Sequence, residues 1–265
     1  MSRLRDETEV RAAGSGFVAT VSPAWNIAAN PNGGYLLAIV MAAITEATGL
    51  CDALSVTAHY LRPGTGGAEA DVEVDVVRSG RTLSSVRAVL RQDGKERVLV
   101  MAAMGTLDDA ADEDGAFHLS PTHEIIPPPE MCVDRAALAQ GVELPILSRL
   151  DVRIHPDDAV ANLNNPARVR GWIRLRDGAP PDSLALLLFA DAFPPSVFTR
   201  FGNVGWVPTI ELTAHVRAKP AQGWVQAAFV VDDLSNGRLI ESGTLWDSAG
   251  EMVARSRQLG LLRLA

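Results

Sequence analysis

Three polar side chains stand in otherwise apolar stretches of the second half of the chain. Asp191 follows the apolar run 184–190, Thr209 begins the segment 209–213, and Gln258 lies within the largely apolar segment 253–262. A carboxylate, a hydroxyl and an amide can hold one water molecule, with the carboxylate accepting its proton and the other two groups directing its lone pairs toward a carbonyl carbon. A thioester suits this chemistry because a thiolate is a good leaving group. The sequence therefore predicts Asp191, Thr209 and Gln258 as catalytic residues.

Each of the three residues also has a structural explanation. Gln258 is compatible with a surface position at a strand end, and Thr209 is a β-branched residue that strands favour. Asp191 is compatible with a turn at the end of a helix before Pro194 and Pro195. The catalytic interpretation therefore depends on the elements that would bring the three side chains together.

An internal repeat provides part of that framework. The segment 56–59 (VTAH) matches 212–215 (LTAH) at an offset of 156, and 104–107 (MGTL) matches 259–262 (LGLL) at an offset of 155. These offsets place Thr209 opposite Ala53 and Gln258 opposite Ala103. We interpret the chain as a duplication in which the second copy carries the chemistry.

The order of elements supports the duplication. Residues 33–49 are apolar around nearly the whole helical circumference, which predicts a buried helix, and residues 52–107 alternate apolar and polar side chains, as a strand meander does. A short strand is expected before the helix at 17–21. The second half repeats the order, with a strand at 168–176, a helix at 182–198 and a meander at 207–264.

A buried helix with a meander predicts a curved antiparallel sheet wrapped around a central helix, the hotdog architecture. The predicted fold is therefore an α+β double hotdog. Composition becomes acidic and proline-rich between the halves. We expect an N-terminal module at 1–110, a linker at 111–145 and a C-terminal module at 146–265.

The start of the first helix is a second candidate site. Gly33 and Gly34 stand there, where free backbone N–H groups and the helix dipole can polarise a thioester oxygen or hold a phosphate. The alternative is a tight turn that requires positive φ angles. The densest basic group either contacts phosphates or lies on a solvated sheet face; it comprises Arg62, Arg78, Arg81, Arg87 and Arg91.

Composition excludes other classes of function. The 265 residues carry a net charge of −8 without a basic block, which argues against nucleic acid as a partner. Cys51 and Cys132 lie outside any zinc or disulfide pattern, and we expect no metal and no cofactor. The charged first residues are followed by no apolar leader, and no run of about 18 apolar residues occurs. We expect a cytoplasmic protein without a membrane span.

Over nearly its whole length the chain resembles the acyl-CoA thioesterase II type of double-hotdog enzymes. The resemblance is carried by Asn32-Gly33-Gly34-Tyr35 at the first helix, Leu61-Arg62-Pro63-Gly64, the turn Arg78-Ser79-Gly80-Arg81, and Asp191, Thr209 and Gln258. It implies an acyl-CoA substrate, a water-binding triad of Asp191, Thr209 and Gln258, and substrate binding at Gly33, Gly34 and Tyr35. Glu211 and Leu212 depart from the Asp or His that the family often shows after the threonine.

Two other functions remain open at this stage. A hotdog enoyl-CoA hydratase or dehydratase would need an Asp and His dyad near the helix, and no His accompanies Asp191. A non-catalytic acyl-CoA or lipid-binding protein would need only the cavity. Exposed sheet edges also predict a homo-oligomer, a dimer or larger.

Overall fold

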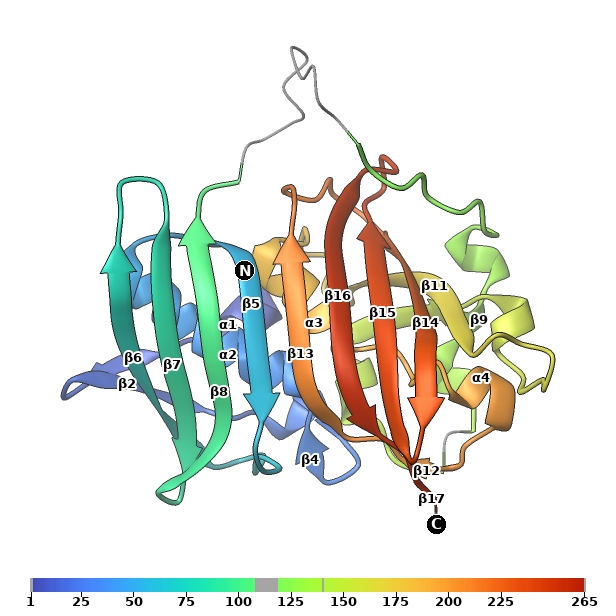
Figure 1. Ribbon diagram of the computed structural model, residues 1–265, viewed down its shortest axis with the longest axis horizontal. Helices are drawn as coiled ribbons and strands as arrows, with labels where there is room; N and C mark the ends of the chain where they lie inside the picture. Colours follow the sequence, from blue (N-terminus) through green and yellow to red (C-terminus); the bar gives the residue numbers. More distant parts are fainter. Residues whose placement is uncertain (1, 108–118, 140, 265) are drawn as a thin grey trace.

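A single antiparallel sheet runs through both halves of the chain (Figure 1). The computed structural model describes residues 2–107, 119–139 and 141–264. Within them, thirteen strands follow the order β1-β2-β6-β7-β8-β5-β13-β16-β15-β14-β11-β10-β9. Helices α2 and α3 lie behind this sheet in Figure 1. The architecture is the predicted α+β double hotdog.

Six of the described strands of the main sheet come from the N-terminal half and seven from the C-terminal half. Those of the N-terminal half are β1 (Arg11–Ala13), β2 (Gly16–Thr20), β5 (Asp52–Tyr60), β6 (Glu69–Ser79), β7 (Ser84–Gln92) and β8 (Lys95–Gly105). Those of the C-terminal half are β9 (Val133–Asp134), β10 (Leu150–Ile154), β11 (Arg168–Leu175), β13 (Thr209–Val216), β14 (Val225–Ser235), β15 (Arg238–Trp246) and β16 (Met252–Leu261). Two small ribbons pair β3 (Asn26–Ile27) with β4 (Asn30–Pro31), and β12 (Gly205–Trp206) with β17 (Arg263–Leu264). Both predicted meanders are confirmed.

The helices are few. They are α1 (Arg3–Glu7), α2 (Gly33–Thr48), α3 (Ser183–Phe189) and α4 (Phe198–Phe201), with short 3-10 turns η1 (Pro23–Trp25), η2 (Pro129–Met131), η3 (Arg135–Ala137), η4 (Pro145–Ser148) and η5 (Pro156–Asp158). None of the helices in the described ranges is long and apolar enough to cross a membrane.

Helix α2 begins and ends as its sequence predicts. Asn32 caps it, since its Oδ1 accepts a hydrogen bond from the Tyr35 backbone N–H at 3.0 Å. Gly49 ends it in the left-handed conformation, with φ at +70°. Ten of its sixteen residues are buried, because the sheet covers one side and α3 packs against another. The predicted all-round burial is confirmed.

The two halves join where β5 pairs with β13. Thr57 lies opposite Thr213 in this ladder, and their hydroxyl oxygens are 2.9 Å apart. The same two residues are equivalent in the internal repeat. An antiparallel pair in which equivalent residues face each other has a pseudo-twofold axis between them, so the duplication is built into the sheet.

The second helix is shorter than predicted. We expected a helix over 182–198, whereas α3 ends at Phe189 and the chain turns before α4. Pro194 and Pro195 prevent the expected continuation to residue 198, because proline lacks an N–H group and disfavours a helical conformation in the residue before it. The earlier end at Phe189 accompanies a hydrogen bond from Asn32 Nδ2 of the other half to the Asp191 backbone oxygen. The end of α3 is thus released from helical geometry at Ala190 and Asp191.

The described part of the predicted linker packs on the C-terminal half. Backbone oxygens of Pro121, Glu124 and Pro127 accept hydrogen bonds from Trp246, Gln226 and Trp172, respectively. Residues 108–118, which include the acidic run, lie outside the described residues. The expected module boundaries stay a prediction.

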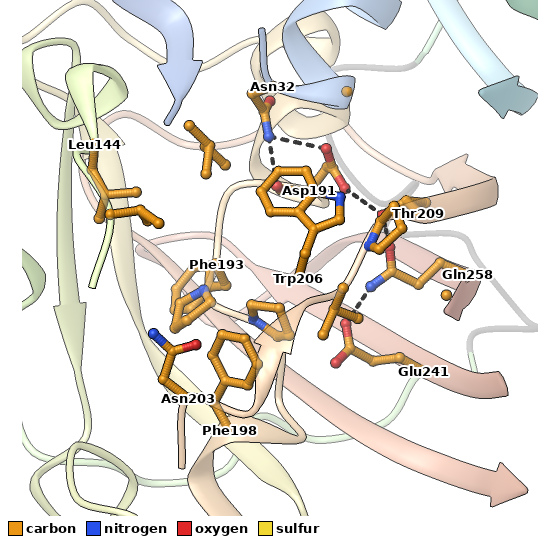
Figure 2. A pocket seen from close by; sticks show the side chains of 18 of the residues that line it. Asn32, Leu144, Asp191, Phe193, Phe198, Asn203, Trp206, Thr209, Glu241 and Gln258 are labelled. Atoms are coloured by element: carbon orange, nitrogen blue, oxygen red, sulfur yellow. Dashed lines mark hydrogen bonds between the residues drawn. The ribbon is translucent and has the colours of Figure 1, made fainter. Parts of the chain in front are cut away.

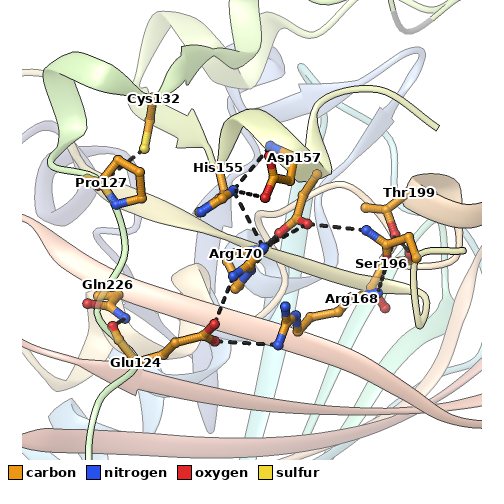
Figure 3. A network of polar contacts seen from close by, with 12 residues as sticks. Glu124, Pro127, Cys132, His155, Asp157, Arg168, Arg170, Ser196, Thr199 and Gln226 are labelled. Atoms are coloured by element: carbon orange, nitrogen blue, oxygen red, sulfur yellow. Dashed lines mark hydrogen bonds and ion pairs between the residues drawn. The ribbon is translucent and has the colours of Figure 1, made fainter. Parts of the chain in front are cut away.

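Charged residues reinforce this packing (Figure 3). Arg170 on β11 is 8% exposed and pairs with Asp158 and Glu124, each at 2.8 Å. Arg168 reaches Glu124 at 3.6 Å from the same strand. A buried arginine needs such partners because an unpaired buried charge is costly. The network therefore anchors the segment around Glu124 to the sheet.

Candidate active site

A pocket of about 1160 Å³ opens between the start of α2, the segment after α3 and the inner face of β13, β15 and β16 (Figure 2). Polar side chains gather on one wall, including Asn32, Asp191, Thr209, Glu241 and Gln258. Apolar side chains line much of the remainder, among them Leu144, Phe193, Phe198 and Trp206. The pocket therefore combines a polar wall with an apolar chamber.

Asp191 is held by the opposite half of the molecule. Its Oδ2 accepts hydrogen bonds from the Gly34 backbone N–H at 2.8 Å and from Asn32 Nδ2 at 3.0 Å. Asn32 Nδ2 also donates to the Asp191 backbone oxygen at 2.8 Å. The start of α2 thus orients a carboxylate that follows α3, with help from the positive end of the helix dipole.

The glycines at the start of α2 permit this approach. A Cβ atom on Gly33 would lie 2.9 Å from Asp191 Oδ2, and one on Gly34 would lie 2.9 Å from the Leu188 backbone oxygen. Neither glycine has a positive φ angle. The alternative explanation of a turn with positive φ is therefore wrong, and glycine is needed because the two helices meet closely there.

The environment of Asp191 raises its pKa to about 6 from the usual 3.8. Removal from solvent is the main cause, and the negative charge of Glu241 adds to it. Hydrogen bonds from Gly34, Thr209 and Asn32 oppose the rise by stabilising the carboxylate. Asp191 is thus ionised at neutral pH but a stronger base than an ordinary aspartate, which suits general-base chemistry.

Thr209 and Gln258 lie beside Asp191. Thr209 Oγ1 is 3.3 Å from Asp191 Oδ1 and 3.1 Å from Gln258 Oε1. A β-bulge between Thr209 and Glu211 turns the threonine toward the pocket, although strict alternation with Leu212 would direct it outward. The structure thus brings the three predicted catalytic residues together, while their roles stay a proposal.

The strand register corrects one equivalence. Leu212 pairs with Gln258 and its counterpart Val56 pairs with Ala102, so Gln258 corresponds to Ala102 and not to Ala103. The offset of 155 predicted from the match at 104–107 was one residue short in this strand. Because successive strand residues face opposite sides, that slip would have put the counterpart on the outer face.

Sequence analysis missed Glu241 on β15. Its carboxylate accepts hydrogen bonds from Gln258 Nε2 at 2.5 Å, from the Ser196 backbone N–H at 2.9 Å and from the Ser196 hydroxyl. Burial is the main cause that raises the pKa of Glu241. The sequence did hold a signal for it, because Glu241 falls in the same every-second-residue series as the inward-facing Leu239, Gly243 and Leu245.

The two tyrosines of the chain have different environments. Tyr35 is fully buried away from the pocket lining, where its hydroxyl donates to the Glu7 backbone oxygen at 2.6 Å and its ring stacks on Trp25. The side chain of Tyr35 therefore packs in the core instead of facing a substrate. Tyr60 does line the pocket, and its buried hydroxyl has no hydrogen-bond partner among the described residues.

The predicted basic group is mostly remote from the pocket. Arg62 lines it and donates to the Glu96 backbone oxygen at 3.0 Å. The other four arginines do not appear in its lining; Arg91, for example, pairs with Glu73 and Glu96 on the sheet surface. Arg62 is the member of the group that is placed to meet a ligand entering the pocket.

Fold and site together define a double-hotdog protein with a carboxylate-based site between its halves. Family models described as the acyl-CoA thioesterase N-terminal domain and C-terminal domain match residues 21–107 and 129–262. The chain belongs to this acyl-CoA thioesterase family, and it is a thioester hydrolase by that membership.

Individual relatives resemble this chain over most of its length. A crystal structure from Thermobifida fusca YX, described as a candidate thioesterase II, superposes with a TM-score of 0.87 at 30% identity and covers 99% of this chain and 98% of that chain. A tesB protein of Mycobacterium avium subs paratuberculosis has a TM-score of 0.77 at 22% identity, with 98% of each chain covered, and shows the fold alone. An uncharacterized protein of Mycobacterium tuberculosis strain H37Rv is 25% identical over 93% of this chain and 90% of its own length.

Proposed function

We propose that the protein hydrolyses an acyl-CoA to the free acid and CoA, using water activated by Asp191. The observation that carries this proposal is the contact chain from the start of α2 through Asp191 and Thr209 to Gln258 on the pocket wall. Family membership supports the thioester as the bond that is cleaved.

The chemistry balances with this chain's own groups. Water attacks the acyl carbonyl carbon as Asp191 accepts one of its protons, and Thr209 and Gln258 hold the water in line. The carbonyl oxygen becomes an oxyanion beside the Gly33 backbone N–H at the positive end of α2. The carbon–sulfur bond then breaks, the carbonyl reforms, and the thiolate leaves and takes up the proton.

The arrangement gives the acyl-CoA a direction of entry. The apolar chamber around Phe193, Phe198 and Trp206 suits the acyl group, and Arg62 supplies a positive charge for a phosphate of the CoA. Among the described residues that line the pocket, none is a histidine, so no observation favours the Asp and His dyad of a hydratase.

A thiol-release assay over short, medium, long and aromatic acyl-CoAs tests the proposal. We expect wild-type protein to release CoA thiol, and Thr209→Ala to reduce kcat at least tenfold. Thr213→Ala is the matched control, because Thr213 lies on the same strand but contacts Thr57 and Glu211 instead of the pocket. No thiol release from any acyl-CoA would overturn the proposal.

We also propose that the chain forms a homo-oligomer. Among the described residues the sheet is open at both ends, at β1 and β9, and an open edge leaves backbone N–H and C=O groups with which a second chain can pair. Light scattering at micromolar concentration should give at least twice the mass of one chain. The cytoplasmic location expected from the sequence stays a prediction.

A further inference from the structure

The amide of Gln258 has two different ends, and its neighbours determine which end faces the site. Its Nε2 lies 2.5 Å from Glu241 Oε1, and its Oε1 lies 3.1 Å from Thr209 Oγ1. An ionised carboxylate only accepts hydrogen bonds, so the amide must turn its N–H₂ group toward Glu241. The carbonyl oxygen of Gln258 then faces Thr209, whose hydroxyl also lies 3.3 Å from Asp191 Oδ1.

Glu241 is itself fixed. It is 4% exposed on the inner side of β15, and its Oε2 accepts both the backbone N–H and the hydroxyl of Ser196. The backbone N–H of Ser196 can only donate, so it requires an acceptor at this position. Ser196 therefore holds Glu241 with its other oxygen, Oε1, directed at Gln258 (Figure 2).

We propose that Glu241, anchored by Ser196, is a positioning residue that orients Gln258 so that its carbonyl oxygen accepts a proton of the attacking water. The wall then offers two acceptors, Asp191 and Gln258, for the two hydrogens of one water. A water held in this way presents a lone pair to the acyl carbon. This inference rests on the proposed function and adds Glu241 and Ser196 to the site.

Glu241→Gln tests the orientation with little change in shape. The Ser196 backbone N–H keeps the new amide oxygen, so the new amide nitrogen must face Gln258, where two donors would oppose each other. Gln258 relieves this conflict by turning over, which directs its N–H₂ group at Thr209. We expect kcat to fall roughly 10–100-fold with KM little changed, because misplacement of a reacting group costs about that much.

The exchange variant Glu241→Gln/Gln258→Glu provides the rescue. The amide at 241 donates to the carboxylate at 258, and the free oxygen of that carboxylate again accepts at Thr209. We expect kcat at least tenfold above the Glu241→Gln single variant. Asp151→Asn is the matched control, because it makes the same change in a buried carboxylate that pairs with Arg174 and Arg176 outside the pocket lining; it should keep wild-type kcat.

Melting temperatures separate catalysis from folding. If Glu241→Gln keeps wild-type kcat, or if the exchange variant gains nothing while remaining folded, the inference is wrong. Should Glu241→Gln not fold, Ser196→Ala decides, because it removes one anchor of Glu241 and should lower kcat several-fold; unchanged kcat would overturn the inference. Thiol release by wild-type protein and its loss in Asp191→Asn test the proposed function separately, so the two can fail independently.

Discussion

The two helices that lie against the sheet, α2 and α3, each meet a carboxylate of the opposite half, but only one of these carboxylates lines the pocket. At the start of α2, Asp191 accepts from Gly34 and Asn32. At the start of α3, Asp52 accepts from the Ser183 hydroxyl at 2.9 Å and from the Leu107 backbone N–H at 3.0 Å. Asp52 is 7% exposed and absent from the pocket lining.

The surroundings explain this difference. Both β5 and β13 have a bulge at the equivalent place, between Ala53 and Ser55 and between Thr209 and Glu211. The first half has Ala53 there, and Ala102 at the position equivalent to Gln258, so both polar partners are missing. A carboxylate thus stands at each helix start, Asp52 from β5 and Asp191 from the chain after α3, but polar partners at the two strand positions accompany Asp191 and not Asp52.

The connections also differ. Helix α2 runs for 16 residues and leads to β5 after a short turn, whereas α3 ends after 7 residues. The segment 190–208 then contributes Phe193, Phe198 and Val207 to the pocket lining. The shorter helix of the second half thus leaves a segment that encloses the chamber, and Pro194 and Pro195 keep this segment from continuing the helix.

The largest difference in turnover should separate the variants of the two aspartates. Asp191→Asn removes the proposed base and should lower kcat about 10²–10⁴-fold while the protein stays folded. Asp52→Asn should leave kcat within about threefold of wild type and reduce the free energy of unfolding by roughly 1–3 kcal/mol, because it disturbs a buried acceptor of two hydrogen bonds. Thiol release and urea unfolding measure both quantities.

Two results would contradict this comparison of the two aspartates. Equal rate losses in Asp191→Asn and Asp52→Asn at matched stability would mean that the first half also carries chemistry. Wild-type turnover in Asp191→Asn would remove the base from the mechanism altogether.

The pH dependence gives the next effect. Because the base must be ionised and the pKa of Asp191 is raised to about 6, kcat/KM should fall about tenfold per pH unit below pH 6. An acid limb near pH 4, the range of an ordinary aspartate, would contradict this. Activity measured from pH 4.5 to 8.5 gives the result.

Stability should change with pH in the opposite direction. The pKa of Asp191 is higher in the folded state, so its contribution to stability is complete below pH 3.8 and is lost as pH rises through about 6. This rise in the pKa of Asp191 corresponds to a loss of roughly 3 kcal/mol in the free energy of unfolding above pH 6. Asp191→Asn should therefore be more stable than wild type at pH 8, and urea unfolding at that pH would detect the gain.

Much of this site was predictable because its residues contradict their local pattern. A carboxylate after an apolar run and polar residues facing alanines in the repeat indicated Asp191, Thr209 and Gln258 without any contact information. Glu241 follows the same rule, since it pairs with Gln258 as the apolar Val86 pairs with Ala102. Neither letter match of the repeat lies in β15, so the sequence did not assign this counterpart. The one-residue slip at Ala102 arose because the letter match at 104–107 is itself out of register with the ladder, in which Gly260 and Met104 occupy equivalent positions.

Other features required three-dimensional packing. Residue type alone could not tell that Tyr35 turns into the core, since that depends on which side of α2 the sheet covers. Apolar periodicity predicted the second helix but not its end at Phe189, because the turn around Asp191 is stabilised by Asn32 and Gly34 from the other half. Long-range partners of this kind leave no local pattern in the sequence.

A polar substitution in the first half sharpens the comparison further. Ala102→Gln places an amide at the position equivalent to Gln258, but Ala102 is 5% exposed and its neighbour Ala53 offers no hydroxyl. We expect a loss of roughly 1–3 kcal/mol in the free energy of unfolding, from an unpaired buried amide and overpacking. Thiol release should not increase. Ala103→Gln, one residue along, should cost less, and equal costs would contradict the register that assigns Ala102 to the inner face.

The smallest expected change in the free energy of unfolding concerns the two tyrosines, of which Tyr35 lies in the core and Tyr60 lines the pocket. Tyr35→Phe removes a hydroxyl that donates to Glu7 and accepts from the Ser22 backbone N–H, so the free energy of unfolding should fall by about 1–2 kcal/mol. Tyr60→Phe removes a buried hydroxyl that has no partner among the described residues, so the free energy of unfolding should stay constant or rise by up to about 1 kcal/mol. The same ring and the same missing atom make the pair directly comparable by urea unfolding. A loss of stability in Tyr60→Phe as large as that in Tyr35→Phe would mean that the Tyr60 hydroxyl is hydrogen-bonded in solution.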